Sequence, residues 1–226
     1  MNLLQLATRL HRESGRSGNG PTTIVGASKD HLRLFDWIND AWTELQNRPL
    51  DWRWMRERVT ATLTTGISSY SGASLSAADF GKWRPYSKEY TPKCYETATP
   101  ENYWRLGWMT LEQFRDHYVD SSPPAGRPLD WSIDDDGSLL IGPEPDAAYG
   151  IKSEYLHAPT ELVADTDEPD FQTSHHMLLV WRALIEVGTF DNAADVLARA
   201  SANFARAENS LLAEYARPLH FGGPLA

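Results

Sequence analysis

The sequence has little cysteine, little positive charge and no long apolar run. Its 226 residues include one cysteine, Cys94, which excludes an intramolecular disulfide and a cysteine-based zinc site and favours assembly in a reducing compartment. The net charge of −10 and the pI near 5.1 argue against tight binding of phosphate, because nucleic-acid-binding proteins normally present a basic face. Without a signal peptide or a membrane-spanning run, the chain is expected to be soluble and to contact no membrane.

No catalytic or cofactor motif is found along the chain. The acidic turn at 134–137 lacks the alternating ligands and distal Glu of a calcium loop, and the glycine-rich segment 15–20 lacks the register of a phosphate loop. His175 and His176 are adjacent and therefore point about 100° apart on a helix, so they do not suit one metal ion. The acidic segment 165–170 is expected to be an exposed linker. We therefore expect no catalytic residue, no metal and no cofactor.

The N-terminal part shows two segments of helical periodicity. The first covers residues 2–14, and the second follows Ser28, a good N-cap, and is ended by Arg48 and Pro49. The apolar face of the second helix contains Leu34, Phe35, Trp37, Ile38, Ala41, Trp42 and Leu45. Its polar face contains Asp36, Asn39, Asp40, Thr43, Glu44 and Gln46. This pattern predicts an amphipathic helix that packs against a core.

Two further helices are expected near the C-terminus. The first should be capped by Thr173 or Ser174 and should end at Gly188. After a tight turn, the second should continue to about Tyr215, and its alanines should allow close packing between helices. Its apolar stripe contains Ala193, Val196, Leu197, Ala200, Phe204, Ala207, Leu211 and Tyr215.

The middle of the chain changes to strand-like patterns. Residues 52–65 alternate between apolar and polar side chains and predict a strand, and 83–95 contains one or two edge strands interrupted by prolines. A short helix is expected at 110–119. Residues 128–157 are interpreted as a small antiparallel sheet of three strands, two of which flank an Asp-Gly turn at 136–137.

This order of elements predicts an α+β fold that is mainly α. A helical core would carry an inserted small antiparallel β-domain. The expected divisions are N-terminal helices at 1–50, a β-rich insertion at 51–160, a C-terminal helix pair at 161–216 and an extended tail at 217–226.

The segment 37–59 holds four of the nine tryptophans and joins the helices to the strands. Aromatic side chains in that number are expected in a core or an interface, so we predict that they form the joint between the two parts. They are Trp37, Trp42, Trp52 and Trp54. Arg53, Arg56 and Arg58 alternate with aromatic residues here, as in some single-strand-binding surfaces, but a strand with one wet face is the favoured interpretation.

Several stretches resemble the head-to-tail adaptor (connector) proteins of tailed bacteriophages. They are LATRLHRESGRSGNGPTTIVG, LRLFDWINDAWTELQNRPLDWRWMRERVT, RPLDWSIDDDGSLLIGPEPDAAYGIKSEYLHAPTEL and DEPDFQTSHHMLLVWRALIEVGTFDNA. The resemblance spans most of the chain and implies a structural virion protein, not an enzyme, at the head–tail junction, assembled in the host cytoplasm. It implies a homo-oligomeric ring, commonly a dodecamer, whose partners are the portal protein and a tail or nozzle protein. Double-stranded DNA would pass through the ring during packaging and ejection without sequence-specific binding.

The same resemblance assigns a role to the C-terminal tail. In such adaptors the tail extends and docks into the portal, here with Leu219, Phe221 and Leu225 as anchors. The docking segment would consist of Arg217, Pro218, Leu219, His220, Phe221, Gly222, Gly223, Pro224, Leu225 and Ala226. Two alternatives remain at this stage: a soluble binding protein that acts in tail completion or assembly, and a hydrolase that uses carboxylates.

Overall fold

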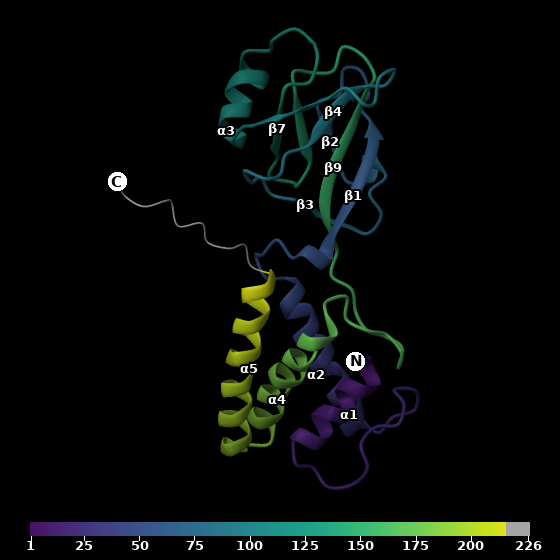
Figure 1. The fold of residues 1–226 in the computed structure, drawn as a ribbon, viewed down its shortest axis with the longest axis vertical. Coiled ribbons are helices and arrows are strands. Elements are labelled where there is room, and N and C mark those ends of the chain that lie inside the picture. The colour runs from purple at the N-terminus through teal and green to yellow at the C-terminus, as the bar shows by residue number, and fades with distance from the viewer. Residues whose placement is uncertain (216–226) are drawn as a thin grey trace, which may run out of the picture. The chain divides into compact units, whose positions relative to one another are not determined.

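The computed structural model describes residues 1–215 and divides the chain into two compact units (Figure 1). A helical unit contains Met1–Trp54 and the chain from Pro159 on, and a β unit contains Met55–Ala158. Helices account for about 39% of the chain and strands for about 20%, in two sheets of mostly antiparallel pairs. This confirms the α+β fold class. The unit boundaries fall at 54/55 and 158/159, whereas the sequence placed divisions at 50/51 and 160/161.

The helical unit begins with two helices, each of which is capped by the side chain of the residue that precedes it. The described helices of this unit are α1 (Leu3–Glu13), α2 (Lys29–Gln46), α4 (Met177–Phe190) and α5 (Ala194–Tyr215). Asn2 and Gln5 form a reciprocal capping box on α1, and Ser28 caps α2 as expected. Both helices bury their apolar faces, since Leu3, Leu6, Leu10, Leu34 and Ile38 are fully enclosed.

The C-terminal helix pair packs closely, as expected, but Gly188 has another role than the expected helix end. Gly188 does not end α4, which continues to Phe190; a Cβ at position 188 would lie 3.0 Å from the backbone nitrogen of Leu197 on α5. The glycine therefore lies at a tight contact between two helices and not at a helix end. The expected cap is also wrong: a 3-10 turn, η4 (Thr173–His175), precedes α4, and His176 stands at the cap without a side-chain bond.

The β unit contains two sheets. Its strands are β1 (Arg56–Thr62), β2 (Ser69–Tyr70), β3 (Phe80–Trp83), β4 (Lys93–Glu96), β5 (Tyr103–Arg105), β6 (Gly107–Trp108), β7 (Asp130–Ile133), β8 (Leu139–Gly142) and β9 (Tyr149–His157). One sheet has the order β1-β9-β4-β5, with β3 also paired to β9, and the other has the order β2-β8-β7-β6. Only the β6–β7 pair is parallel among the described strands.

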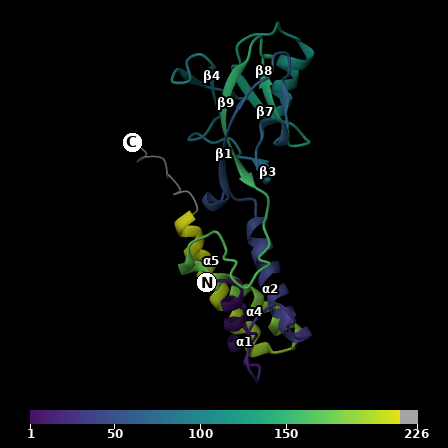
Figure 2. The same cartoon turned by 90° about the vertical axis from the view of Figure 1, so that its right-hand side faces the viewer.

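The position of β9 corrects the expected three-stranded sheet at 128–157. The hairpin of β7 and β8 around Asp136 and Gly137 is confirmed, but β9 joins the other sheet and lies between β1 and β4 (Figure 2). Six of the nine residues of β9 are buried, while Lys152 is exposed and Glu154 is half-buried. This burial fits an interior strand with hydrogen-bonded neighbours on both edges, which the third strand at the end of a hairpin sheet would not have.

Two further segments differ from the sequence expectation. The strand expected at 52–65 starts only at Arg56, because Arg53–Met55 forms the 3-10 turn η1. The helix expected at 110–119 consists of one α-helical turn, α3 (Leu111–Phe114), followed by the π-helical segment η3 (Arg115–Asp120). The core of the β unit draws side chains from both sheets, including Val59, Trp131, Leu139, Ile141 and Ile151.

Candidate interaction sites

Three of the four predicted joint tryptophans form one aromatic cluster in the helical unit. We define this cluster as Trp42, Trp52, Trp54, Phe171 and Tyr215. Trp52 stacks on Trp54 with ring centroids 4.3 Å apart, and Trp54 meets Tyr215 edge-on at 4.8 Å. Phe171 stacks on Trp42 at 5.5 Å and lies 5.4 Å from Trp54. The cluster thus ties the chain just after α2 to the start of α4 and the end of α5.

The tryptophans of the cluster differ in burial. Trp42 and Trp52 are enclosed, with exposed fractions of 0% and 1%, and the indole nitrogen of Trp52 donates to the carbonyl of Leu45 at 2.9 Å. Trp54 is half-buried. Trp37 lies apart from the cluster: it is half-buried against Phe190, with centroids 5.7 Å apart, and below the guanidinium of Arg16.

The predicted docking tail, residues 217–226, lies outside the residues that the structure describes. The described chain ends at Tyr215, whose ring belongs to the aromatic cluster.

Two amides on α2 hold the segment through which the chain returns to the helical unit. Asn39 donates to the carbonyl of Leu162 and accepts from its amide, both at 2.9 Å. Two turns later, Gln46 makes the same pair of bonds with Thr160, also at 2.9 Å. Gln46 is only 3% exposed, so these bonds satisfy its buried amide, whereas its partner Thr160 is exposed. The sequence places both amides on the polar face of α2. Their seven-residue spacing puts them on the same side of the helix, which is the sequence signal for contact with one common segment.

The acidic segment at 165–170 is fixed in place and is not a loose linker. Asp165 accepts hydrogen bonds from the Thr23 hydroxyl at 2.7 Å and the Ile24 amide at 2.8 Å. Asp167 accepts from the amides of Val163 and Ala164, and these bonds lower the pKa of its carboxyl. The expectation of exposure holds for other acidic residues of this region, namely Glu161, Glu168 and Asp170.

His175 and His176 serve separate structural contacts. The ring of His175 lies 2.7 Å from the Glu214 carboxylate on α5. His176 is enclosed: its Nε2 lies 2.8 Å from the carbonyl of Phe171, and its Nδ1 lies 2.6 Å from the amino group of Met1. Burial lowers the pKa of His176 and favours the neutral ring. Within the described chain, no three His, Cys, Asp or Glu side chains converge as a metal site, and no helix has the length and apolarity to span a membrane.

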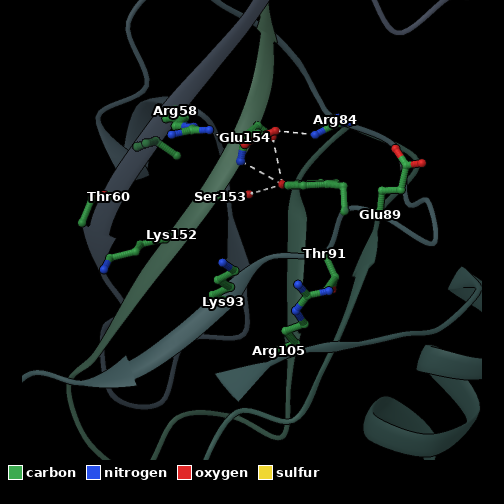
Figure 3. Close-up of a pocket in the computed structure, with 12 residues that line it drawn as sticks. Arg58, Thr60, Arg84, Glu89, Thr91, Lys93, Arg105, Lys152, Ser153 and Glu154 are labelled. Carbon is green, nitrogen blue, oxygen red and sulfur yellow. Dashed lines mark hydrogen bonds and ion pairs between the residues drawn. The ribbon is translucent and has the colours of Figure 1, made fainter. Parts of the chain in front are cut away.

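The β unit contains a pocket of about 420 Å³ with a basic lining (Figure 3). We call it the basic pocket and define it by its charged residues: Arg58, Arg84, Glu89, Lys93, Arg105, Lys152 and Glu154. Tyr90 lines this pocket and is hydrogen-bonded to β9. Its hydroxyl accepts from the Glu154 amide at 2.8 Å and bonds to the Ser153 hydroxyl. Burial raises the pKa of Tyr90, so this hydroxyl stays protonated.

Glu154 organises one side of the basic pocket. Its carboxylate accepts from Arg84, which is buried, and from Arg58 at 3.3 Å, which is exposed. The Arg84 guanidinium also lies 4.6 Å from the Tyr90 ring centroid. Of the three arginines considered as a single-strand-binding stripe, only Arg58 lines this pocket; Arg53 belongs to η1 and Arg56 starts β1.

The candidate residues of the described chain serve structural contacts, and none of them forms a metal cluster there. The chain belongs to the SU10 adaptor protein family, whose model matches residues 1–226. This confirms the resemblance to phage head-to-tail adaptors. A comparison with curated proteins gives no match.

Family membership makes the protein a phage adaptor. It implies contacts with portal and tail proteins and a structural role in the virion, and it favours a non-enzymatic function.

Proposed function

We propose that the protein assembles as a closed ring, with twelve subunits as the expected number, that joins the portal to the tail or nozzle at the head–tail junction of the virion. The observation that carries this proposal is the match of one adaptor family model to the whole chain, residues 1–226. Double-stranded DNA would pass through the central channel. The net charge of −10 supports this part of the proposal, because an acidic surface repels the DNA backbone and lets it move without adhering.

We also propose that residues 217–226 dock into the portal. The sequence supports this role, since Leu219, Phe221 and Leu225 are isolated apolar side chains among glycines and prolines, which suits a segment that folds on binding. Deletion of 221–226 should weaken binding to the portal and leave the thermal unfolding midpoint unchanged. If the truncated chain binds portal as tightly as the full chain, the tail does not dock there.

The helical unit and the β unit would then act as the core and the inserted domain of each subunit. The aromatic cluster would fix the start of the insertion, and the half-buried Trp37 and Trp54 would be available to a neighbouring subunit. The central experiment is electron microscopy and native mass spectrometry of the purified chain, alone and with portal. Closed rings are expected at least on the portal. Monomers only, with portal present, would contradict the proposal.

A further inference from the structure

Three cations in the basic pocket lie directly opposite one another on adjacent strands. Lys152 on β9 is the register partner of Lys93 on β4, and Lys93 is the register partner of Arg105 on β5. Figure 3 shows the three side chains one after another across these strands. Like charges at directly opposed positions destabilise a sheet, so this row reduces the stability of the free subunit. Lys93 lies over the Tyr103 ring at 4.5 Å and Lys152 over the Tyr95 ring at 4.9 Å, which offsets part of the repulsion.

The pocket concentrates positive charge within an acidic unit. Met55–Ala158 contains ten Lys or Arg and fifteen Asp or Glu residues; five of the former and two of the latter line the pocket. One of the two acids, Glu154, is already shared by Arg58 and Arg84. The row of Lys152, Lys93 and Arg105 forms no ion pair within residues 1–215 and is complementary to an anionic segment.

The helical unit supplies a segment of opposite charge. We call residues 161–170 the acidic connector; its exposed carboxylates are Glu161, Glu168 and Asp170. Glu161 and Asp170 form no ion pair within residues 1–215. Bonds to Leu162 from Asn39 and to Asp165 from Thr23 hold the connector in one shape, and Val163 on it is 69% exposed. A segment that is ordered before binding loses little conformational entropy when it docks.

We propose that the basic pocket of one subunit binds the acidic connector of a second copy of this chain. The proposal rests on the ring proposed above, because a closed ring requires two different faces of each subunit to meet. The pocket and the connector are two such faces with opposite charge. Such pairing orients the subunits and suppresses wrong contacts. The remaining repulsion within the row would be relieved in the assembled ring.

A polypeptide segment fits the pocket better than duplex DNA does. The pocket is a concavity of about 420 Å³ with the carboxylates of Glu89 and Glu154 in its lining. A duplex is too wide to enter it and would meet an overall net charge of −10. Carboxylate side chains on a narrow loop can reach the row of cations.

The test reverses charge on each face of the full-length chain. Arg105→Glu with Lys152→Glu should reduce ring formation about tenfold, and Glu161→Lys with Asp170→Lys should do the same. All four substitutions in one chain restore opposite charges and should recover the rings. The matched control is Lys82→Glu with Lys88→Glu, which makes the same change of charge at exposed sites outside the pocket and should leave assembly unchanged. Circular dichroism establishes that each variant is folded.

The outcomes separate this proposal from the proposed function. Wild-type rings that Arg105→Glu with Lys152→Glu leaves intact would overturn the pocket contact alone, as would a fourfold variant that fails to recover. If the same double variant assembles normally but binds duplex DNA more weakly, the pocket is a DNA contact. A wild type that neither forms rings on portal nor self-associates in sedimentation velocity at low salt overturns both proposals.

Discussion

Trp52 and Trp54 stack on each other with ring centroids 4.3 Å apart and ring planes inclined by only 23°. Successive same-face residues of a strand are about 6.6 Å apart along the chain, so this stack requires the 3-10 turn at Arg53–Met55. Both indoles therefore pack within the aromatic cluster of the helical unit, and β1 begins two residues after Trp54.

Trp52→Ala should lower the free energy of unfolding by about 3–5 kcal/mol, because it removes an enclosed indole and leaves a cavity beside Trp54. Trp52→Phe keeps most of the packing and removes one hydrogen bond to the Leu45 carbonyl, which still accepts from the Arg48 amide, and should cost about 1 kcal/mol. Urea unfolding measures both. Trp37→Ala, at a half-buried site away from the cluster, should cost less than Trp52→Ala; an equal loss would mean that the cluster has no special role.

Gln46→Leu should destabilise the protein although it adds apolar volume to a buried site. The substitution removes two hydrogen bonds to the backbone of Thr160; because Thr160 is exposed, water replaces part of them, and the expected loss is about 1–2 kcal/mol in total. Thermal unfolding measures the loss. Gln172→Leu, at an exposed position without a side-chain bond, is the control and should change the midpoint little. If Gln46→Leu leaves the unfolding midpoint unchanged, water fully replaces the hydrogen bonds of the Gln46 amide.

Stability should fall as the pH drops below about 6.5, in part because of His176. Burial lowers the pKa of His176 below the ordinary histidine value of 6.5, so the unfolded chain binds a proton at a higher pH than the folded chain does. The contribution of the neutral ring is therefore complete above pH 6.5 and is lost as the pH falls towards the folded pKa. One such proton changes stability by at most about 1.4 kcal/mol per pH unit.

His176→Gln is the variant that isolates this effect. It should weaken the pH dependence of unfolding below 6.5, whatever it does to stability at neutral pH. His11 has a pKa lowered by burial, His31 and Arg16, so part of the dependence should remain. A wild-type and a His176→Gln curve with the same slope would rule out His176 as a contributor.

Cys94 should not react with thiol reagents in the native protein. Its side chain is fully enclosed, and burial raises the pKa of the thiol to about 12, so almost no thiolate is present at neutral pH. Labelling with iodoacetamide followed by mass spectrometry should show modification only in denaturant. Rapid labelling without denaturant would mean that β4 opens locally, since Cys94 lies in that strand.

The sequence predicts local features of this fold well. The caps and apolar face of α2 and the β7–β8 hairpin around Asp136 and Gly137 depend on residues close together in the chain, and the structure has them at the expected places. Gly188 was misread because a glycine near a helix end suits both a C-cap and a close helix contact, and only the position of Leu197 distinguishes them.

The partners and the register of the strands could not be predicted from local sequence patterns. The sequence of β9 reads as a strand, but its choice of β1 and β4 over β8 depends on how whole sheets pack. The row of Lys152, Lys93 and Arg105 follows from that register, so no spacing in the sequence points to it. The basic pocket is therefore a product of long-range pairing, whereas the tryptophan-rich segment was visible in the composition.

The pairing of β1 with β9 also shapes the order in which the chain can fold. These strands are the first and last of the β unit, and they pair from Arg56 with Leu156 to Thr62 with Gly150. Until they meet, the two halves of the helical unit are separated by a long flexible loop, and closing it is entropically unfavourable. Once they pair, that loop becomes a short bridge between α2 and the return segment at Thr160. We therefore expect the β unit to gain protection from hydrogen exchange before the contacts of α2 with α4 form.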